Sequence, residues 1–183
     1  MNKIMFSLLI SILISWSNSN PDSNFHIYLA FGQSNMEGQG EIEPQDTANV
    51  PERFKLLASV HMPTQGRIKG NWYTAVPPLC RGYTRIGVTD YFGRELVENL
   101  PDDISVGLIN VAIGGASIDL FDEDKVEEYL PTQPDWFQNI AAEYGEHPYI
   151  LLVQLGKIAK KDGVIKGILM HQGETNTGDE EWP

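Results

Sequence analysis

The sequence is poor in cysteine, histidine and basic residues, and each shortage narrows what the protein can be. One cysteine, Cys80, stands among 183 residues, so no disulfide can form within the chain. Only four histidines occur, and none of them pair at the spacing of metal ligands, so we expect no metal site. Lys and Arg number 13 against 25 Asp and Glu, for a formal net charge of -12. Such a surface repels phosphate backbones, which argues against nucleic acid as a partner but not against a neutral sugar polymer.

Long apolar runs are also missing. The apolar run over residues 4–14 is too short to span a bilayer comfortably, so we expect no membrane span. Lys3 precedes this run, and the small residues Ser15, Ser17 and Ser19 follow it, a pattern typical of a secretory signal peptide. We therefore expect residues 1–19 to be a signal peptide and the protein to be secreted or periplasmic. A buried first helix or an anchor is the alternative, but nothing amphipathic marks this stretch.

The remaining chain alternates apolar segments with segments of helical spacing. The predicted strands are 25–31, 54–60, 104–113 and 164–170, with the last expected to be buried. The predicted helices run from Thr89 or Asp90 to Leu100, over 134–144 and over 147–161. Residues 61–87 are rich in Pro and Gly and predict a long irregular connection. This alternation predicts an α/β fold with a parallel sheet, and its carboxyl-terminal edge is where ligands bind.

Three segments at the ends of predicted strands carry residues suited to acyl transfer, which needs a nucleophile, a base and a site for the oxyanion. Ser34 is a candidate nucleophile, because Gly32 lets the chain turn tightly off its strand; the alternative is an ordinary turn or helix cap. The Gly114-Gly115 pair is a candidate oxyanion site, because a residue without Cβ lets a backbone N–H approach a substrate oxygen. The alternative for this pair is a simple strand-end turn.

The third segment adds side chains. Gln172 offers a side-chain N–H to the oxyanion, and Glu174 offers a carboxylate that could orient an imidazole. His171 is interpreted as a structural histidine, since a residue directly after a buried strand often points into packing. Asn35, Trp72 and His171 are candidate substrate contacts, and Trp72 is expected to pack near the pocket.

These segments carry a family resemblance. The residues are GQSNMEG at 32–38, AIGGASI at 112–118 and HQGETN at 171–176. In this order, each after a strand, they resemble the sialate O-acetylesterase-like (SASA) family, and look closest to acetylxylan esterases of the sixth carbohydrate-esterase family, within the SGNH hydrolase superfamily. The resemblance covers about residues 25–183. It implies a three-layer α/β/α, flavodoxin-like fold with a mostly parallel sheet, and hydrolysis of O-acetyl esters on oligo- or polysaccharides without a cofactor.

Carried over to this sequence, the family pattern implies that Ser34 is the nucleophile and that Ser34 and the Gly114-Gly115 turn donate backbone N–H groups to the oxyanion. Gln172 then adds a third donor, and Glu174 assists the catalytic histidine. The family's Asp-x-x-His block does not occur in this sequence. We therefore expect residues 25–183 to be the amino-terminal part of the domain, truncated at the carboxyl end and nearly inactive alone. The alternatives are a non-catalytic carbohydrate-binding module on the same fold and another SGNH esterase or lipase.

Overall fold

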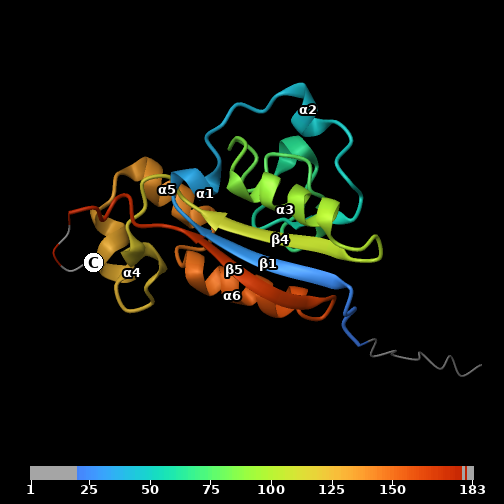
Figure 1. Ribbon diagram of the computed structural model, residues 1–183. Helices are drawn as coiled ribbons and strands as arrows, with labels where there is room; N and C mark the ends of the chain where they lie inside the picture. Colours follow the sequence, from blue (N-terminus) through green and yellow to red (C-terminus); the bar gives the residue numbers. More distant parts are fainter. Residues whose placement is uncertain (1–19, 179, 181–183) are drawn as a thin grey trace, which may run out of the picture.

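A five-stranded sheet forms the centre of the computed structural model, which describes residues 20–178 and 180 (Figure 1). The strands are β1 (Phe25–Gly32), β2 (Phe54–Leu57), β3 (Trp72–Thr74), β4 (Ser105–Ala112) and β5 (Val164–His171). Their order across the sheet is β3-β2-β4-β1-β5, and every pair is parallel except the antiparallel pair β2–β3. The expected signal peptide, residues 1–19, lies outside the described residues.

Helices cover both faces of this sheet. The α3 helix (Val88–Asn99) lies on one face, and α6 (Pro148–Ala159) lies on the other (Figure 1). The shorter helices are α1 (Ser34–Glu37), α2 (Pro44–Thr47), α4 (Val126–Tyr129) and α5 (Asp135–Glu143). Three short 3-10 helices span Pro63–Gln65, Ile118–Phe121 and Leu130–Thr132. The predicted three-layer α/β/α arrangement with a mostly parallel sheet is confirmed.

The order of β4, β1 and β5 matters for the site. These three parallel strands follow the 2-1-3 order of a flavodoxin-like sheet, with β2 and β3 added beyond β4. After β1 the chain forms β2, β3 and β4 on one side of it and then crosses to β5 on the other. In such sheets, the crevice between the carboxyl ends of strands on either side of this reversal binds ligands. Here the reversal lies at β1, between β4 and β5.

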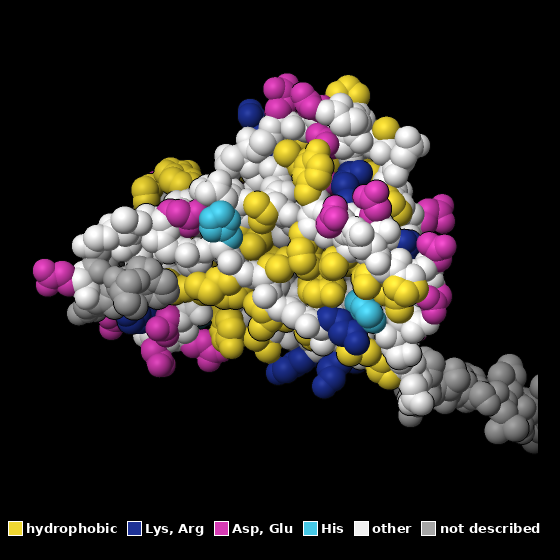
Figure 2. Space-filling view, viewed as in Figure 1, with side chains coloured by type: hydrophobic (Ala, Val, Ile, Leu, Met, Phe, Trp, Pro, Cys, Tyr) yellow, Lys and Arg dark blue, Asp and Glu magenta, His cyan; other side chains and the backbone are white. Residues whose placement is uncertain are grey.

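Two predictions about secondary structure need correction. The β5 strand is not buried on both faces, because Ile168 is 63% exposed and Met170 is 50% exposed. Figure 2 shows hydrophobic side chains gathered on the face of the molecule where β5 runs. The long connection over residues 61–87 is also less irregular than its composition predicts, since it contains β3, which is held by pairing with β2 rather than by a pattern of its own.

The start of α3 differs from the prediction by one or two residues. The helix begins at Val88, and the preceding Gly87 occupies the cap position without a side-chain hydrogen bond. Asp90 lies inside the helix, and its carboxylate pairs with Arg94 one turn later, at 2.5 Å. No helix within the described ranges is long and apolar enough to cross a membrane.

Candidate active site

The three glycine-containing segments meet because β4, β1 and β5 end at one level. Gly32, the last residue of β1, pairs with Ala112 of β4 on one side and with His171 of β5 on the other. Just beyond, the Ile113 N–H donates to the Gly32 carbonyl at 3.2 Å, and the Gln33 N–H donates to the His171 carbonyl at 3.1 Å. The structure therefore brings the three segments to one edge, as the strand pattern predicts.

The turn that presents Ser34 depends on glycine. Gly32 has a φ of +153°, and a Cβ at this position would lie 2.0 Å from the carbonyl oxygen of His171, so only glycine fits between β1 and β5 here. The chain then enters α1, and Ser34 is its first residue. The N–H of a first helical residue has no acceptor within the helix. From β4, the buried Asn110 donates to the Met36 carbonyl at 3.0 Å and holds α1 on the sheet.

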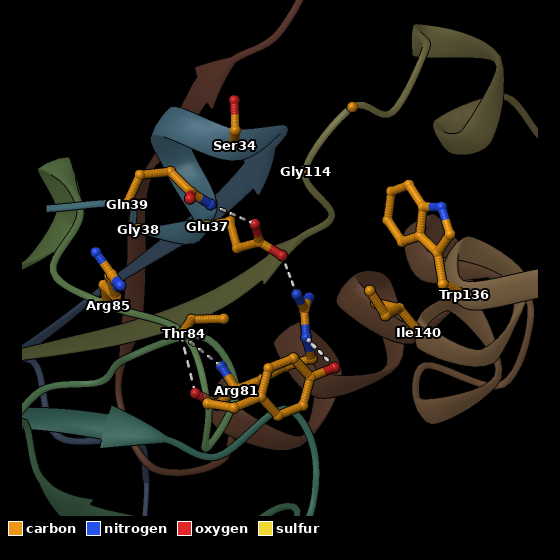
Figure 3. A pocket seen from close by; sticks show the side chains of 12 residues that line it. Ser34, Glu37, Gly38, Gln39, Arg81, Thr84, Arg85, Gly114, Trp136 and Ile140 are labelled. Carbon is orange, nitrogen blue, oxygen red and sulfur yellow. Dashed lines mark hydrogen bonds and ion pairs between the residues drawn. The ribbon is translucent and has the colours of Figure 1, made fainter. Parts of the chain in front are cut away.

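Ser34 lines a pocket of about 390 Å³ at this edge (Figure 3). Its walls come from α1 and the residues after it, from the loop before α3, from the Gly114-Gly115 turn and from α5. Figure 3 shows the Ser34 hydroxyl directed outward from the start of α1, with Trp136 and Ile140 of α5 on the opposite wall. The volume falls in the range of natural small-ligand sites.

The Gly114-Gly115 turn forms the wall next to Ser34. A Cβ on Gly114 would lie 3.7 Å from the Cβ of Ser34 and 2.8 Å from Oε2 of Glu37. Gly115 has a φ of +77°, in the left-handed region that favours glycine, and space is open around it. The turn therefore presents bare backbone to the pocket beside Ser34, which is the arrangement that lets an N–H approach an oxyanion.

Beneath the pocket lies a buried ion pair between Glu37 and Arg81. The Arg81 side chain is 1% exposed, and it also donates to the Ala112 carbonyl and, at 2.9 Å, to the Tyr144 hydroxyl. Glu37 accepts a second hydrogen bond from Nε2 of Gln39 at 2.8 Å. Because buried charges require such partners, this network fixes the last residue of α1 to the end of β4 and to the loop before α3. It thereby fixes the helix that carries Ser34.

Gln172 lies next to the glycine turn but does not line the Ser34 pocket. Its Nε2 donates to the Ala116 carbonyl at 2.7 Å, and its Oε1 is buried without a hydrogen-bond partner among the described residues. A side-chain amide carries two N–H groups, so one remains for another acceptor. In this arrangement, Gln172 supports the turn that contains Gly114 and Gly115.

Glu174 connects the third segment to the first. Its Oε1 accepts from Nδ2 of Asn35 at 2.9 Å, and it lies 3.2 Å from Nε2 of His171. The interpretation of His171 as a packed structural residue is wrong, because its side chain is 44% exposed and faces this carboxylate. Two residues on, Asn176 donates to the Ser117 hydroxyl at 3.0 Å and so ties the third segment to the second as well.

The Ser34 hydroxyl itself has no hydrogen bond to any side chain in the described parts of the chain. Within the same residues, no group of three or more His, Cys, Asp or Glu side chains is placed to hold a metal ion. The pocket thus presents a serine hydroxyl, bare backbone and a buried ion pair as its chemical groups. This set of groups suits transfer of an acyl group to serine once a base is supplied.

The family model for "Carbohydrate esterase, sialic acid-specific acetylesterase" matches residues 24–183. The chain belongs to this family of SASA esterases. The match covers nearly all of the described chain and includes the three segments that surround Ser34.

Three solved structures share the SASA fold with this chain. A protein from Arabidopsis thaliana is 22% identical with a TM-score of 0.59, over 85% of this chain and 60% of that one. A protein described as a novel carbohydrate acetylesterase from Xanthomonas citri is 23% identical with a TM-score of 0.52, over 84% and 33%. NanS is 19% identical with a TM-score of 0.57, over 89% and 57%. The chain therefore spans 33% to 60% of the length of these proteins.

Trp72, a predicted substrate contact, lies away from the Ser34 pocket. Its ring packs edge-on against Phe25, the first residue of β1, at 4.8 Å between centroids, and its Nε1 donates to Asp162 at 2.9 Å. Both partners are at the amino-terminal end of β1, whereas Ser34 follows its carboxyl-terminal end. The tryptophan that does line the pocket is Trp136, which is 56% exposed.

Several pocket residues were not found from the sequence. Glu37 stands inside the GQSNMEG segment and could have been singled out there, and Arg81 follows the one cysteine directly. Neither residue carries a pattern that reveals the pairing, because Arg81 lies in a loop without periodicity. Trp136 and Gln39 have no local signal that places them beside Ser34.

Cys80 is a buried free thiol. Burial raises the pKa of this thiol to about 11, and its sulfur lies 3.2 Å from the Tyr144 hydroxyl. Because the thiolate is the reactive form, a thiol with so high a pKa is inert near neutral pH. Cys80 therefore belongs to the packing beneath the pocket.

Proposed function

We propose that this chain carries the nucleophile and oxyanion site of a carbohydrate O-acetylesterase, with Ser34 as the nucleophile. The observation that carries the proposal is that Ser34, Gly114 and Gly115 line one pocket at the carboxyl-terminal edge of the sheet. Membership of a carbohydrate esterase family supports a sugar ester as the substrate. The Xanthomonas citri protein, described as a carbohydrate acetylesterase, supports acetyl as the group removed.

In the proposed reaction, Oγ of Ser34 attacks the carbonyl carbon of the acetyl ester and loses its proton to a base. The negative charge on the carbonyl oxygen is stabilised by backbone N–H groups of Ser34 and of the Gly114-Gly115 turn, and a preorganised donor of this kind contributes on the order of 100- to 1000-fold in rate. The ester C–O bond then breaks, the sugar hydroxyl takes the proton, and the acetyl group stays on Ser34. Water attacks this acetyl-serine and releases acetate by the same steps.

Two side chains have positioning roles in this proposal. Gln172 holds the Gly114-Gly115 turn through its bond to Ala116, and it keeps one N–H for the oxyanion. Glu174, which holds Asn35 beside the nucleophile, is placed to orient an imidazole, since its Oε1 already lies 3.2 Å from Nε2 of His171. We propose that the reaction needs a histidine orientated in this way beside Ser34. The described residues do not place one there.

Because the Ser34 hydroxyl has no basic partner in the described ranges, we propose that this chain alone turns over slowly. A serine without its base retains only the part of catalysis that comes from the oxyanion site, roughly 1000- to 10,000-fold over water in the best-studied triad. We also propose that residues 1–19 direct export and are then removed. Intact-mass measurement of protein recovered outside the cytoplasm tests this, and we expect the mature chain to begin near Asn20.

The proposal is tested by labelling Ser34 with a fluorophosphonate and measuring the intact mass of the chain. Free imidazole is added in one series to supply the base that the described residues do not bring to Ser34. We expect one label at Ser34, formed faster with imidazole, and none in Ser34→Ala. The matched control is Ser23→Ala, which removes an exposed serine before β1 and should label like the parent. Equal labelling of the parent and Ser34→Ala, with and without imidazole, would reject a nucleophilic role.

A non-catalytic carbohydrate-binding protein on the same fold is the second candidate, favoured because the Ser34 hydroxyl has no side-chain partner among residues 20–178 and 180. It predicts that acetylated sugars bind and that Ser34 stays unlabelled even with imidazole. Labelling of Ser34 together with acetate release from an acetylated sugar excludes this candidate.

A further inference from the structure

A second hollow lies beside the Ser34 pocket. It has a volume of about 450 Å³, and its walls are Asn35, Gln39, Gly40, Ile86, Gly87, Val88 and Tyr91. The two hollows share Gln39, and the consecutive residues Ser34 and Asn35 line one hollow each. Each volume falls within the range of a small-ligand site. The nucleophile therefore stands next to the boundary between two adjoining sites.

The boundary between the two hollows is made mostly of backbone. The Arg85 N–H donates to the Gly38 carbonyl at 3.1 Å, and Gly40 and Ile86 exchange two backbone hydrogen bonds of 3.0 Å each. A Cβ on Gly38 would lie 2.4 Å from the carbonyl oxygen of Arg85, so this pairing requires glycine. Gln39 is the residue between these glycines, and its Nε2 is held by Glu37 at 2.8 Å. This backbone pairing and the anchored amide of Gln39 thus separate the two hollows.

An exposed aromatic side chain stands in each hollow. Trp136, 56% exposed, lines the first, and Tyr91, 58% exposed, lines the second. Tyr91 is held in place because its hydroxyl donates to Oδ1 of Asp46 at 2.9 Å. Figure 3 shows Trp136 across the first hollow from Gln39 and Arg85. Aromatic rings that remain exposed in a concave site gain free energy when a ligand covers them.

This combination suits a sugar chain. The C–H face of a pyranose ring is apolar and packs flat on an aromatic ring, while its hydroxyls need polar partners at the edges. The hollows offer both, with amide groups of Asn35 and Gln39 near the boundary and a ring in each. The formal net charge of -12 disfavours a polyanion as the occupant.

We propose that the two hollows form one groove that binds a neutral O-acetylated oligosaccharide, with the acetylated unit at Ser34 and the next unit across Gln39 against Tyr91. This inference rests on the proposed function and deepens it, because it assigns a chain of linked sugars rather than a free monosaccharide as the substrate. The second hollow is then a second sugar subsite, and Tyr91 and Gln39 are its binding residues.

The test is binding of acetylated xylo-oligosaccharides of one to four units to the full chain, measured by titration calorimetry. We expect affinity to rise roughly five- to tenfold between one unit and two or three units, since one added ring contact is worth that factor. Tyr91→Ala should remove this gain and leave binding of the single unit unchanged. Tyr91→Phe, which keeps the ring, should retain the gain. Tyr149→Ala, which removes a tyrosine that is 39% exposed at the start of α6, is the matched control and should bind like the parent.

The outcomes separate this inference from the proposed function. Affinity that does not depend on chain length, or a gain that survives in Tyr91→Ala, overturns the groove, and labelling of Ser34 then still supports the esterase. A gain lost in Tyr91→Ala and kept in Tyr91→Phe supports the groove even if Ser34 proves unreactive. Circular dichroism of each variant shows whether a loss of binding reflects loss of the fold.

Discussion

The carboxylate of Glu37 and the guanidinium of Arg81 form an ion pair that is buried directly beneath the Ser34 pocket. Glu37 ends α1, the short helix that Ser34 begins, and Arg81 contacts the end of β4. The position of the proposed nucleophile therefore depends on a contact between a short helix and a loop that are far apart in the sequence.

Removing Arg81 should destabilise the protein strongly. In Arg81→Met the carboxylate of Glu37 stays buried without its cation, which costs about 3–5 kcal/mol in the free energy of unfolding. Urea denaturation monitored by circular dichroism measures this. The matched control is Asp102→Asn, at an exposed ion pair with Arg53, which should cost less than about 1 kcal/mol. A loss of similar size in both variants contradicts the importance of the buried pair.

Raising the pH should weaken the fold through Cys80. Burial holds the pKa of its thiol at about 11, against 9.0 for an exposed thiol. Between these values the thiol loses its proton in the unfolded chain and keeps it in the folded chain. The contribution of Cys80 to the free energy of unfolding is therefore fully present below pH 9 and falls by roughly 2–3 kcal/mol as the pH rises to 11. Cys80→Ala should flatten this slope, measured by urea denaturation at each pH. Burial also raises the pKa of Tyr144, which adds a decline in the same direction.

Adding a methyl group to the glycine turn should impair Ser34. In Gly114→Ala the new Cβ would meet Oε2 of Glu37 at 2.8 Å, and that carboxylate cannot move freely because Arg81 and Gln39 hold it. We expect labelling of Ser34 by a fluorophosphonate to slow at least roughly tenfold, as expected when an oxyanion donor is displaced. Gly145→Ala has open space around its Cβ and a φ of +77°, so it should cost some stability but leave labelling normal, because Gly145 does not line the pocket. Unchanged labelling in Gly114→Ala would show that the turn does not assist the reaction.

Replacing Trp72 and replacing Trp136 should have opposite effects on stability and on sugar binding. Trp72→Ala removes a ring that packs on Phe25, so we expect a loss of about 2–3 kcal/mol in stability and little change in binding of acetylated xylo-oligosaccharides. Trp136→Ala removes an exposed ring, so it should leave stability within about 0.5 kcal/mol and weaken binding of every oligosaccharide. Thermal unfolding and calorimetric titration give both quantities. Sugar binding that depends on Trp72 would contradict its placement at the amino-terminal end of the sheet.

The sequence was sufficient for the elements that carry strong local patterns. The apolar segments that became β1 and β4 end at glycines, and parallel strands bring such ends to one edge, so the meeting of Ser34 with Gly115 followed from pattern alone. The expectation that β5 is buried failed because apolar composition does not say whether a neighbour covers the second face. Ile168 and Met170 are apolar and exposed.

Contacts between loops could not be predicted. Trp72 is the first residue of β3, the strand within the Pro- and Gly-rich stretch 61–87 that is defined by pairing with β2, and its side chain packs on Phe25 rather than facing Ser34. Arg81 shows no periodicity, and its burial results from partners on α1 and β4. A tertiary contact of this kind leaves no trace in the spacing of residues along one segment.

The exposed side of β5 also affects how the protein must be handled. Among the described residues, β5 pairs only with β1, so its other flank offers free backbone donors and acceptors to any extended chain. The side chain of Lys166 lies on the same exposed face of the sheet as those of Ile168 and Met170. It places a positive charge beside the free flank of β5. Like charges discourage two such flanks from joining, so concentrated salt, which screens them, is the condition under which this chain most readily self-associates.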